Sequence, residues 1–119
     1  MKTITKATVR ADAILTLRGC SDDTVDVSWT AEPNAGLEDD DCAAGMQRWL
    51  RVELPTGGGV LIGARYAVAG GWFVGVAPLD EDSTSPAISL QQHGYSMVLT
   101  MPVPNGTRLT IWQGAEDRA

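Results

Sequence analysis

Apolar and polar side chains alternate along the first part of the chain, from Lys6 to Arg18, with Ile14 as the one apolar residue at an even position. The odd positions are all apolar, namely Ala7, Val9, Ala11, Ala13, Leu15 and Leu17. Successive side chains of a strand point to opposite faces of a sheet, so this spacing gives one buried face and one largely solvated face. The pattern predicts that the chain opens with a long, half-buried β-strand.

Shorter apolar segments follow the opening strand, and turn-forming residues separate most of them. Thr24–Thr30 alternates again and is expected to form an antiparallel hairpin with the opening strand. Trp49–Leu54 is predicted as a third strand that stops at Pro55. Three more short strands are predicted nearer the end of the chain, at Ala87–Leu90, Tyr95–Met101 and Thr107–Trp112.

Two central segments, Val60–Ala69 and Trp72–Ala77, are apolar without strict alternation. A strand that is apolar on both faces is covered on both, so we expect these two to form a hairpin that lies inside the fold or against a partner. The glycines around them, among them Gly57–Gly59 and Gly75, match no phosphate-binding or dinucleotide-binding spacing. We interpret the glycines of this chain as turn residues.

About eight short strands with turn residues between them are typical of a β-sandwich or a small barrel. We therefore predict a mainly-β fold, a single-domain antiparallel β-sandwich or small barrel that covers residues 1–119. At most one short helix is expected, around residues 35–46, where the alternation stops. The charged tail from about residue 114 is expected to fray.

Fifteen acidic residues against nine basic ones give the chain a net charge of −6. Such a chain repels the phosphate backbone, so no direct nucleic-acid binding is expected. The predicted partners are a protein with a basic surface or further copies of the chain itself. The N-terminal residues lack the apolar stretch of a secretory signal, and no segment of the chain has the length of a bilayer span, which predicts no membrane contact and a cytoplasmic location.

Catalytic and metal-binding patterns are missing from the sequence. His93 is the only histidine, and no nucleophile motif or four-ligand zinc spacing accompanies it. Cys20 and Cys42 are expected to be free thiols, with a single disulfide between them as the alternative. We therefore predict no catalytic residue, no metal site and no cofactor.

The four tryptophans separate by strand parity into two kinds. Trp29 and Trp72 share a side with valines and are expected in the core. Trp49 shares a side with Arg51, and Trp112 shares a side with Arg108, so these four are expected to point away from the core and to contact a partner. The alternative is that Trp49 and Trp112 fill a second core layer or cover a sheet edge.

Four consecutive acidic residues form the second half of the predicted protein-binding set. They are Glu38, Asp39, Asp40 and Asp41. With the acidic segment Asp80–Asp82 this acidic run is expected to engage a basic target. The function predicted is thus that of a non-catalytic macromolecule-binding protein, such as a small phage or mobile-element inhibitor. One alternative is a subunit of a larger assembly, such as a virion or tail component, whose central hairpin packs on copies of itself. The second alternative is a carbohydrate-binding module that uses surface tryptophans.

Overall fold

The computed structural model describes residues 4–19, 25–29, 36–39, 47–67, 71–81, 87–93 and 96–113. These residues form ten strands in two antiparallel five-stranded sheets. Sheet A has the order β1 (Ile4–Thr8), β10 (Arg108–Gln113), β5 (Gln47–Glu53), β6 (Gly59–Ala67) and β7 (Gly71–Pro78). Sheet B has the order β4 (Gly36–Asp39), β3 (Val25–Trp29), β2 (Ala13–Gly19), β9 (Ser96–Val103) and β8 (Ser89–His93).

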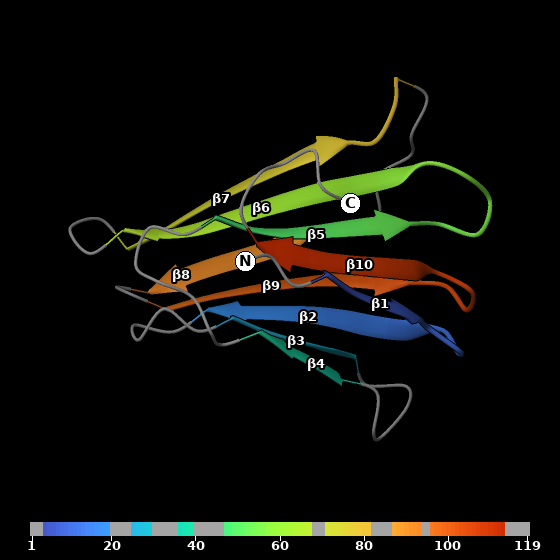
Figure 1. The fold of residues 1–119 in the computed structure, drawn as a ribbon, viewed down its shortest axis with the longest axis horizontal. Helices are drawn as coiled ribbons and strands as arrows, with labels where there is room; N and C mark the ends of the chain where they lie inside the picture. The colour runs from blue at the N-terminus through green and yellow to red at the C-terminus, as the bar shows by residue number, and fades with distance from the viewer. Residues whose placement is uncertain are drawn as a thin grey trace.

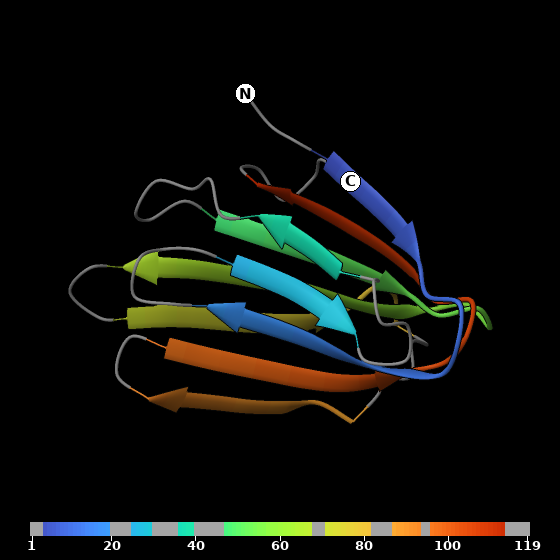
Figure 2. The same cartoon turned by 90° about the horizontal axis from the view of Figure 1, so that it is seen from below.

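The two sheets are stacked with their strands running in roughly similar directions (Figures 1 and 2). One apolar core lies between them and takes side chains from both sheets, among them Leu15 and Leu99 of sheet B and Leu50 and Ile62 of sheet A. Neither sheet closes on itself, so the architecture is an open β-sandwich rather than a barrel. The predicted mainly-β, single-domain fold is confirmed.

The alternating segment at the start of the chain is two strands rather than one. Its first part is β1 in sheet A, and its second part is β2 in sheet B. The crossing between them is held by backbone hydrogen bonds at Val9, whose N–H donates to Thr107 O at 2.8 Å and whose carbonyl accepts from Gly106 N–H at 2.7 Å. Alternation continues through the crossing because both sheets turn the same parity towards one core, and Val9 itself is fully buried there.

Two segments differ in detail from what the sequence pattern suggests. Residues 36–39 form β4, which pairs with β3, so this part of the segment around residues 35–46, where at most one short helix is expected, is a strand. No helix occurs in the residues that the structure describes. The central hairpin is confirmed as β6 paired with β7, but only β6 lies inside its sheet, because β7 is an edge strand (Figure 1).

Helices long and apolar enough to cross a membrane are absent from the described segments.

Close contact between the sheets depends on one glycine. Trp72 of β7 is 5% exposed, which confirms its predicted place in the core. A Cβ added to Gly19 of β2 would lie 2.5 Å from the Trp72 ring, well inside van der Waals contact. Gly19 therefore makes room for the indole, and Gln92 of β8 donates a hydrogen bond from Nε2 to Trp72 O at 2.9 Å.

A second glycine shapes the turn between β5 and β6. Gly59 has φ of 139°, and a Cβ there would lie 1.9 Å from Val52 O. Only glycine fits this position, because the conformation and the contact both exclude a side chain. The turn is closed by Leu54 N–H donating to Gly58 O and Gly57 N–H donating to Leu54 O, each at 3.0 Å.

Candidate functional site

The face of sheet A that points away from the core carries the tryptophans and arginines that parity singled out. Register places Trp112 of β10 opposite Trp49 of β5, and their rings stack with centroids 6.2 Å apart and planes 19° from parallel. Their sequence neighbours Ile111 and Leu50 belong to the core cluster, whereas Trp112 does not. The tryptophan pair thus forms a second apolar layer on the outer face of sheet A.

The two tryptophans differ in exposure. Trp112 is 0% exposed, whereas Trp49 is half-buried. A partner can therefore touch Trp49 directly, while Trp112 stacks against the Trp49 ring from the neighbouring strand. That this pair contacts a partner stays a prediction, and Trp49 is the ring that has solvent-exposed surface for such a contact.

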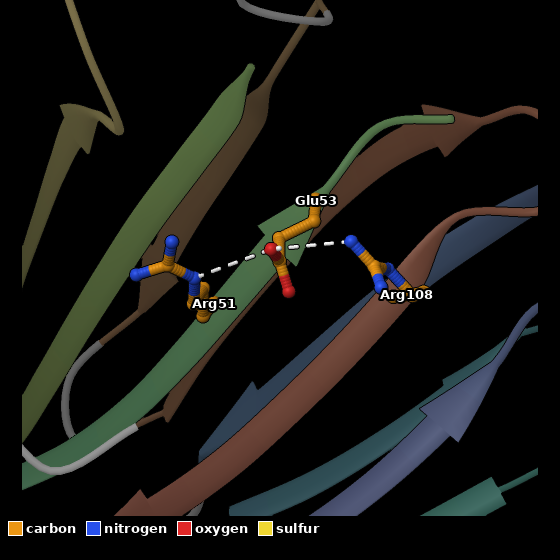
Figure 3. Close-up of polar contacts among 3 residues, drawn as sticks. All are labelled: Arg51, Glu53 and Arg108. Carbon is orange, nitrogen blue, oxygen red and sulfur yellow. Dashed lines mark ion pairs between the residues drawn. The ribbon is translucent and has the colours of Figure 1, made fainter. Parts of the chain in front are cut away.

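Glu53 links the two predicted arginines (Figure 3). Its Oε1 lies 3.7 Å from Arg51 Nε and 3.6 Å from Arg108 Nη2. Arg108 is directly opposite Glu53 in the β10–β5 register, and Arg51 is two residues before Glu53 on β5. One carboxylate shared by two guanidinium groups leaves a net positive charge at this point of the surface.

A dent of about 470 Å³ lies beside this cluster, over β1, β10 and β5. Lys6 and Arg10 line it together with Arg108 and Glu53. Lys6 and Arg10 are exposed, and the Arg108 side chain is 68% exposed. We call this region the cationic dent, defined by Lys6, Arg10, Arg108 and Glu53.

The other half of the same face has two glycines at its centre. Register continues the tryptophan row onto Gly63 of β6 and Gly75 of β7, which lie opposite each other. Because neither glycine has a side chain, a groove of about 610 Å³ opens beside Trp49. We call it the glycine groove, with Gly63 and Gly75 as its floor.

Apolar side chains and one cation border the glycine groove. Leu61 and Ala77 lie opposite each other at one end, and Arg65 and Phe73 lie opposite each other at the other end. Phe73 is 52% exposed, which is an unusual amount of aromatic surface for a strand residue. The guanidinium carbon of Arg65 lies 5.6 Å from the centroid of the Phe73 ring. The groove therefore offers aromatic walls with a cation at one end.

The space above Gly75 is open. A Cβ added there meets no atom within 4 Å in the part of the chain that the structure describes. Our interpretation of the glycines as turn residues is thus wrong for Gly63 and Gly75, which lie inside strands and leave the sheet surface bare. The sequence carried no signal for this, because Gly63 and Gly75 are not equally far from the predicted turn at Gly70 and Gly71 and so are not expected to lie opposite each other.

Charge is divided between the two sheets. The strands of sheet A contain five basic residues (Lys6, Arg48, Arg51, Arg65 and Arg108) and a single carboxylate, Glu53. The strands of sheet B contain three carboxylates (Asp26, Glu38 and Asp39) and a single arginine, Arg18. Sheet A is therefore cationic within a chain whose net charge is −6.

The acidic half of the predicted set lies elsewhere. Glu38 and Asp39 belong to β4, at an edge of sheet B, whereas Asp40 and Asp41 fall outside the described residues. The structure thus unites Trp49, Trp112, Arg51 and Arg108 on sheet A and places Glu38 and Asp39 on the other sheet.

Other candidate groups contribute no cluster. His93 ends β8 and is exposed, and Cys20 and Cys42 lie outside the described residues. Among the residues that the structure describes, no three His, Cys, Asp or Glu side chains are grouped closely enough to hold a metal ion.

Comparison of the chain with protein-family models, with curated proteins and with solved structures finds no match.

Proposed function

We propose that this protein is a non-catalytic protein-binding module that holds an acidic segment of a partner protein on the outer face of sheet A. The observation that supports this most is the glycine groove, an apolar cleft of about 610 Å³ next to a cationic surface. The segment places an aromatic or aliphatic side chain in the groove, and its carboxylates lie over the cationic dent.

The groove suits an apolar anchor because its floor is backbone and its walls are rings. An inserted side chain contacts Gly63 and Gly75 below, Trp49 on one side and Phe73 on another. Removing apolar area from water contributes about 25 cal/mol per Å², so one large side chain supplies much of the affinity. Buried anchors of this kind dominate protein interfaces.

Charge favours an acidic segment. Lys6, Arg10 and Arg108 border the cationic dent, and Arg65 stands at the far end of the groove. Positive groups on both sides of an apolar cleft orient an acidic chain and raise its association rate. This reverses the partner charge expected from the chain as a whole, and a basic partner for the acidic run stays a separate prediction that concerns β4.

The carbohydrate alternative has less support than protein binding. It requires two surface tryptophans as stacking platforms, and Trp112 has no exposed surface.

Selection from a random-peptide library on the immobilised protein tests the proposal. We expect the enriched peptides to be rich in Asp and Glu and to share an aromatic or aliphatic residue. Their affinity is then measured by fluorescence anisotropy for the wild type and for Gly75→Leu, whose side chain fills the groove without meeting another atom at its Cβ. We expect the variant to bind at least ~10-fold more weakly, because the anchor loses its place.

Ser89→Leu is the matched control, since it puts the same side chain on an exposed strand position of sheet B. It is expected to bind the selected peptides as the wild type does. The proposal fails if the enriched peptides show no acidic bias, or if Gly75→Leu binds them with wild-type affinity.

A further inference from the structure

Strand β7 is an edge of sheet A and is unusually apolar for an edge. Its sequence GWFVGVAP contains no charged residue, and no described strand pairs with its far side (Figure 1). Edge strands of natural proteins commonly carry lysines or inward-pointing charges that prevent pairing with another chain. Val76 is 43% exposed and Phe73 is 52% exposed, so this edge also displays apolar side chains.

The hydrogen-bond pattern shows which backbone groups face the open side. Leu79 N–H donates to Gly59 O at 3.1 Å, which places Leu79 and Gly59 in a hydrogen-bonded pair. Such pairs alternate along an antiparallel ladder, so the odd residues of β7 turn their N–H and C=O groups towards β6. The even residues, Val74 and Val76 among them, turn theirs to the open edge. Trp72 follows the same rule, because its carbonyl accepts the hydrogen bond from Gln92 of β8.

We propose that two copies of this chain associate by antiparallel pairing of β7 with β7, in the register that places Gly75 opposite Gly75 of the second copy. In this register Val74 of each copy is opposite Val76 of the other, and both face the partner with N–H and C=O. The two pairs exchange four backbone hydrogen bonds around a two-fold axis, which closes the association at a dimer.

The ends of β7 fit this register. Pro78 has no N–H to donate, and it lies opposite Trp72 of the second copy. The Trp72 carbonyl already accepts from Gln92, so it does not depend on the donor that Pro78 lacks. A register shifted in one direction would put Pro78 opposite Val74 or Val76 and would leave a carbonyl of that residue without a donor. A shift by two residues in the other direction would put Val76 opposite Trp72, whose carbonyl already accepts from Gln92.

Charge agrees with an antiparallel arrangement. Arg65 lies opposite Phe73, near the start of β7, whereas Asp80 and Glu81 follow the end of β7. Antiparallel pairing brings the start of one β7 towards the end of the other, so the Arg65 end of each copy approaches the acidic end of its partner. The pairing strand itself is uncharged and adds no repulsion between two chains of net charge −6.

Pairing in this register joins the two glycine grooves. Because a two-fold axis perpendicular to the sheet keeps the same face outward in both copies, Gly63 and Gly75 of each copy form one continuous row. The row ends at a Trp49 on each side, so the dimer carries one long groove with two aromatic ends. An acidic segment that carries two anchors then binds both halves at once.

Light scattering over a concentration series from about 10 µM to about 1 mM tests the association. We expect the wild type to pass from monomer to dimer mass as the concentration rises. Val76→Lys introduces an inward-pointing charge at an exposed edge position and is expected to dimerise at least ~10-fold more weakly. Val76→Thr keeps a β-branched, uncharged side chain and is expected to dimerise as the wild type does. A wild type that stays monomeric over the whole range overturns the proposal, as does a Val76→Lys protein that dimerises normally.

Cysteine cross-linking tests the register, in a background of Cys20→Ser and Cys42→Ser. Gly75 and its copy form a non-hydrogen-bonded pair with Cα atoms about 4.5 Å apart, which a disulfide spans. Gly75→Cys is therefore expected to give a covalent dimer under mild oxidation. Ala77→Cys lies on the same exposed face, but Ala77 is opposite Phe73 of the partner, about 13 Å along the strand from the second Ala77. Cross-linking by Ala77→Cys and none by Gly75→Cys would show that the register is wrong.

Dimerisation and peptide binding can fail separately. Val76 is among the residues that line the glycine groove, but its side chain lies on the face of β7 opposite to that of Gly75. Val76→Lys therefore keeps Gly75, Trp49 and Phe73 on the groove face, and a monomeric Val76→Lys protein still binds a single-anchor acidic peptide if the proposed function holds. Loss of the dimer without loss of peptide binding, and the reverse, therefore identify which of the two proposals is at fault.

Discussion

The two sheets of this protein bury their inner faces in one core. They differ in the charge of their strands and in how densely side chains cover their outer faces. Sheet A is cationic, with Glu53 as the single carboxylate of its strands, and its outer face is bare over Gly63 and Gly75. Sheet B is acidic, with Asp26, Glu38 and Asp39 in its strands. A net charge of −6 is an average over two unlike surfaces. The charge of a partner is therefore set by the face it meets and not by the charge of the whole chain.

The largest difference between the sheets is expected in the free energy of unfolding, when one large apolar side chain is removed from each outer face. Trp112→Ala on sheet A deletes a side chain that is 0% exposed, and we expect it to lower the free energy of unfolding by about 3–5 kcal/mol. Ile14→Ala on sheet B deletes one that is 44% exposed and should cost less than ~1 kcal/mol. Urea denaturation measures both, and equal losses would contradict a second apolar layer on sheet A.

The next largest effect compares one glycine from each sheet. Gly19→Ala on sheet B pushes a methyl group against the Trp72 ring, and overpacking of this kind costs about 1–3 kcal/mol. Gly75→Ala on sheet A enters open space, and we expect a change within ~0.5 kcal/mol, because alanine suits a strand at least as well as glycine does. Thermal unfolding of the two variants decides the matter. A clear loss of stability in Gly75→Ala would mean that the groove is not open.

Charge-reversal variants show which of the two sheets binds acidic peptides. Arg108→Glu adds a second carboxylate to the cationic dent and is expected to weaken binding of acidic peptides by ~10-fold, or about 1.4 kcal/mol. Glu38→Lys makes the opposite change on β4 of sheet B and should leave that affinity unaltered. Peptide titrations at low and high salt check both variants, since screening reduces the first effect. A stronger effect of Glu38→Lys would move the binding surface to sheet B.

The smallest effect is expected at the carboxylate that interrupts the positive charge of sheet A. Glu53→Gln removes the ion pairs to Arg51 and Arg108, whose side chains are 40% and 68% exposed. Exposed pairs of this kind contribute little, so the unfolding free energy should change by less than ~0.5 kcal/mol. The affinity for acidic peptides should rise about 2-fold, because two arginines lose their internal competitor. A loss of affinity would show that Glu53 orients the arginines rather than competing for them.

Alternation in the sequence revealed which side chains are buried but not which sheet holds them. The odd positions Ala7, Val9, Ala13, Leu15 and Leu17 face the core as predicted, although the chain changes sheets at Val9. Parity is the same in both sheets because both surround one core, so a sheet crossing leaves no mark on the pattern. The division of the opening segment into β1 and β2, together with β4, explains why ten strands were found where about eight were expected.

The candidate site was predictable only in its filled half. Strand parity placed Trp49, Arg51, Arg108 and Trp112 on one face, as the register confirms. Parity could not reveal that Trp112 is fully buried there, because burial on an outer face depends on what covers that face. The glycine groove was missed since a strand glycine has no side chain for a polarity pattern to register.

Mapping of amide chemical shifts by NMR, on titration with a peptide enriched from the library, tests the central claim most directly. The claim predicts that the largest changes occur at Gly63, Gly75 and Phe73 and at the Trp49 indole, with smaller ones at Arg108. Changes concentrated on β4 or β8 of sheet B would contradict it and place the binding surface on the acidic sheet.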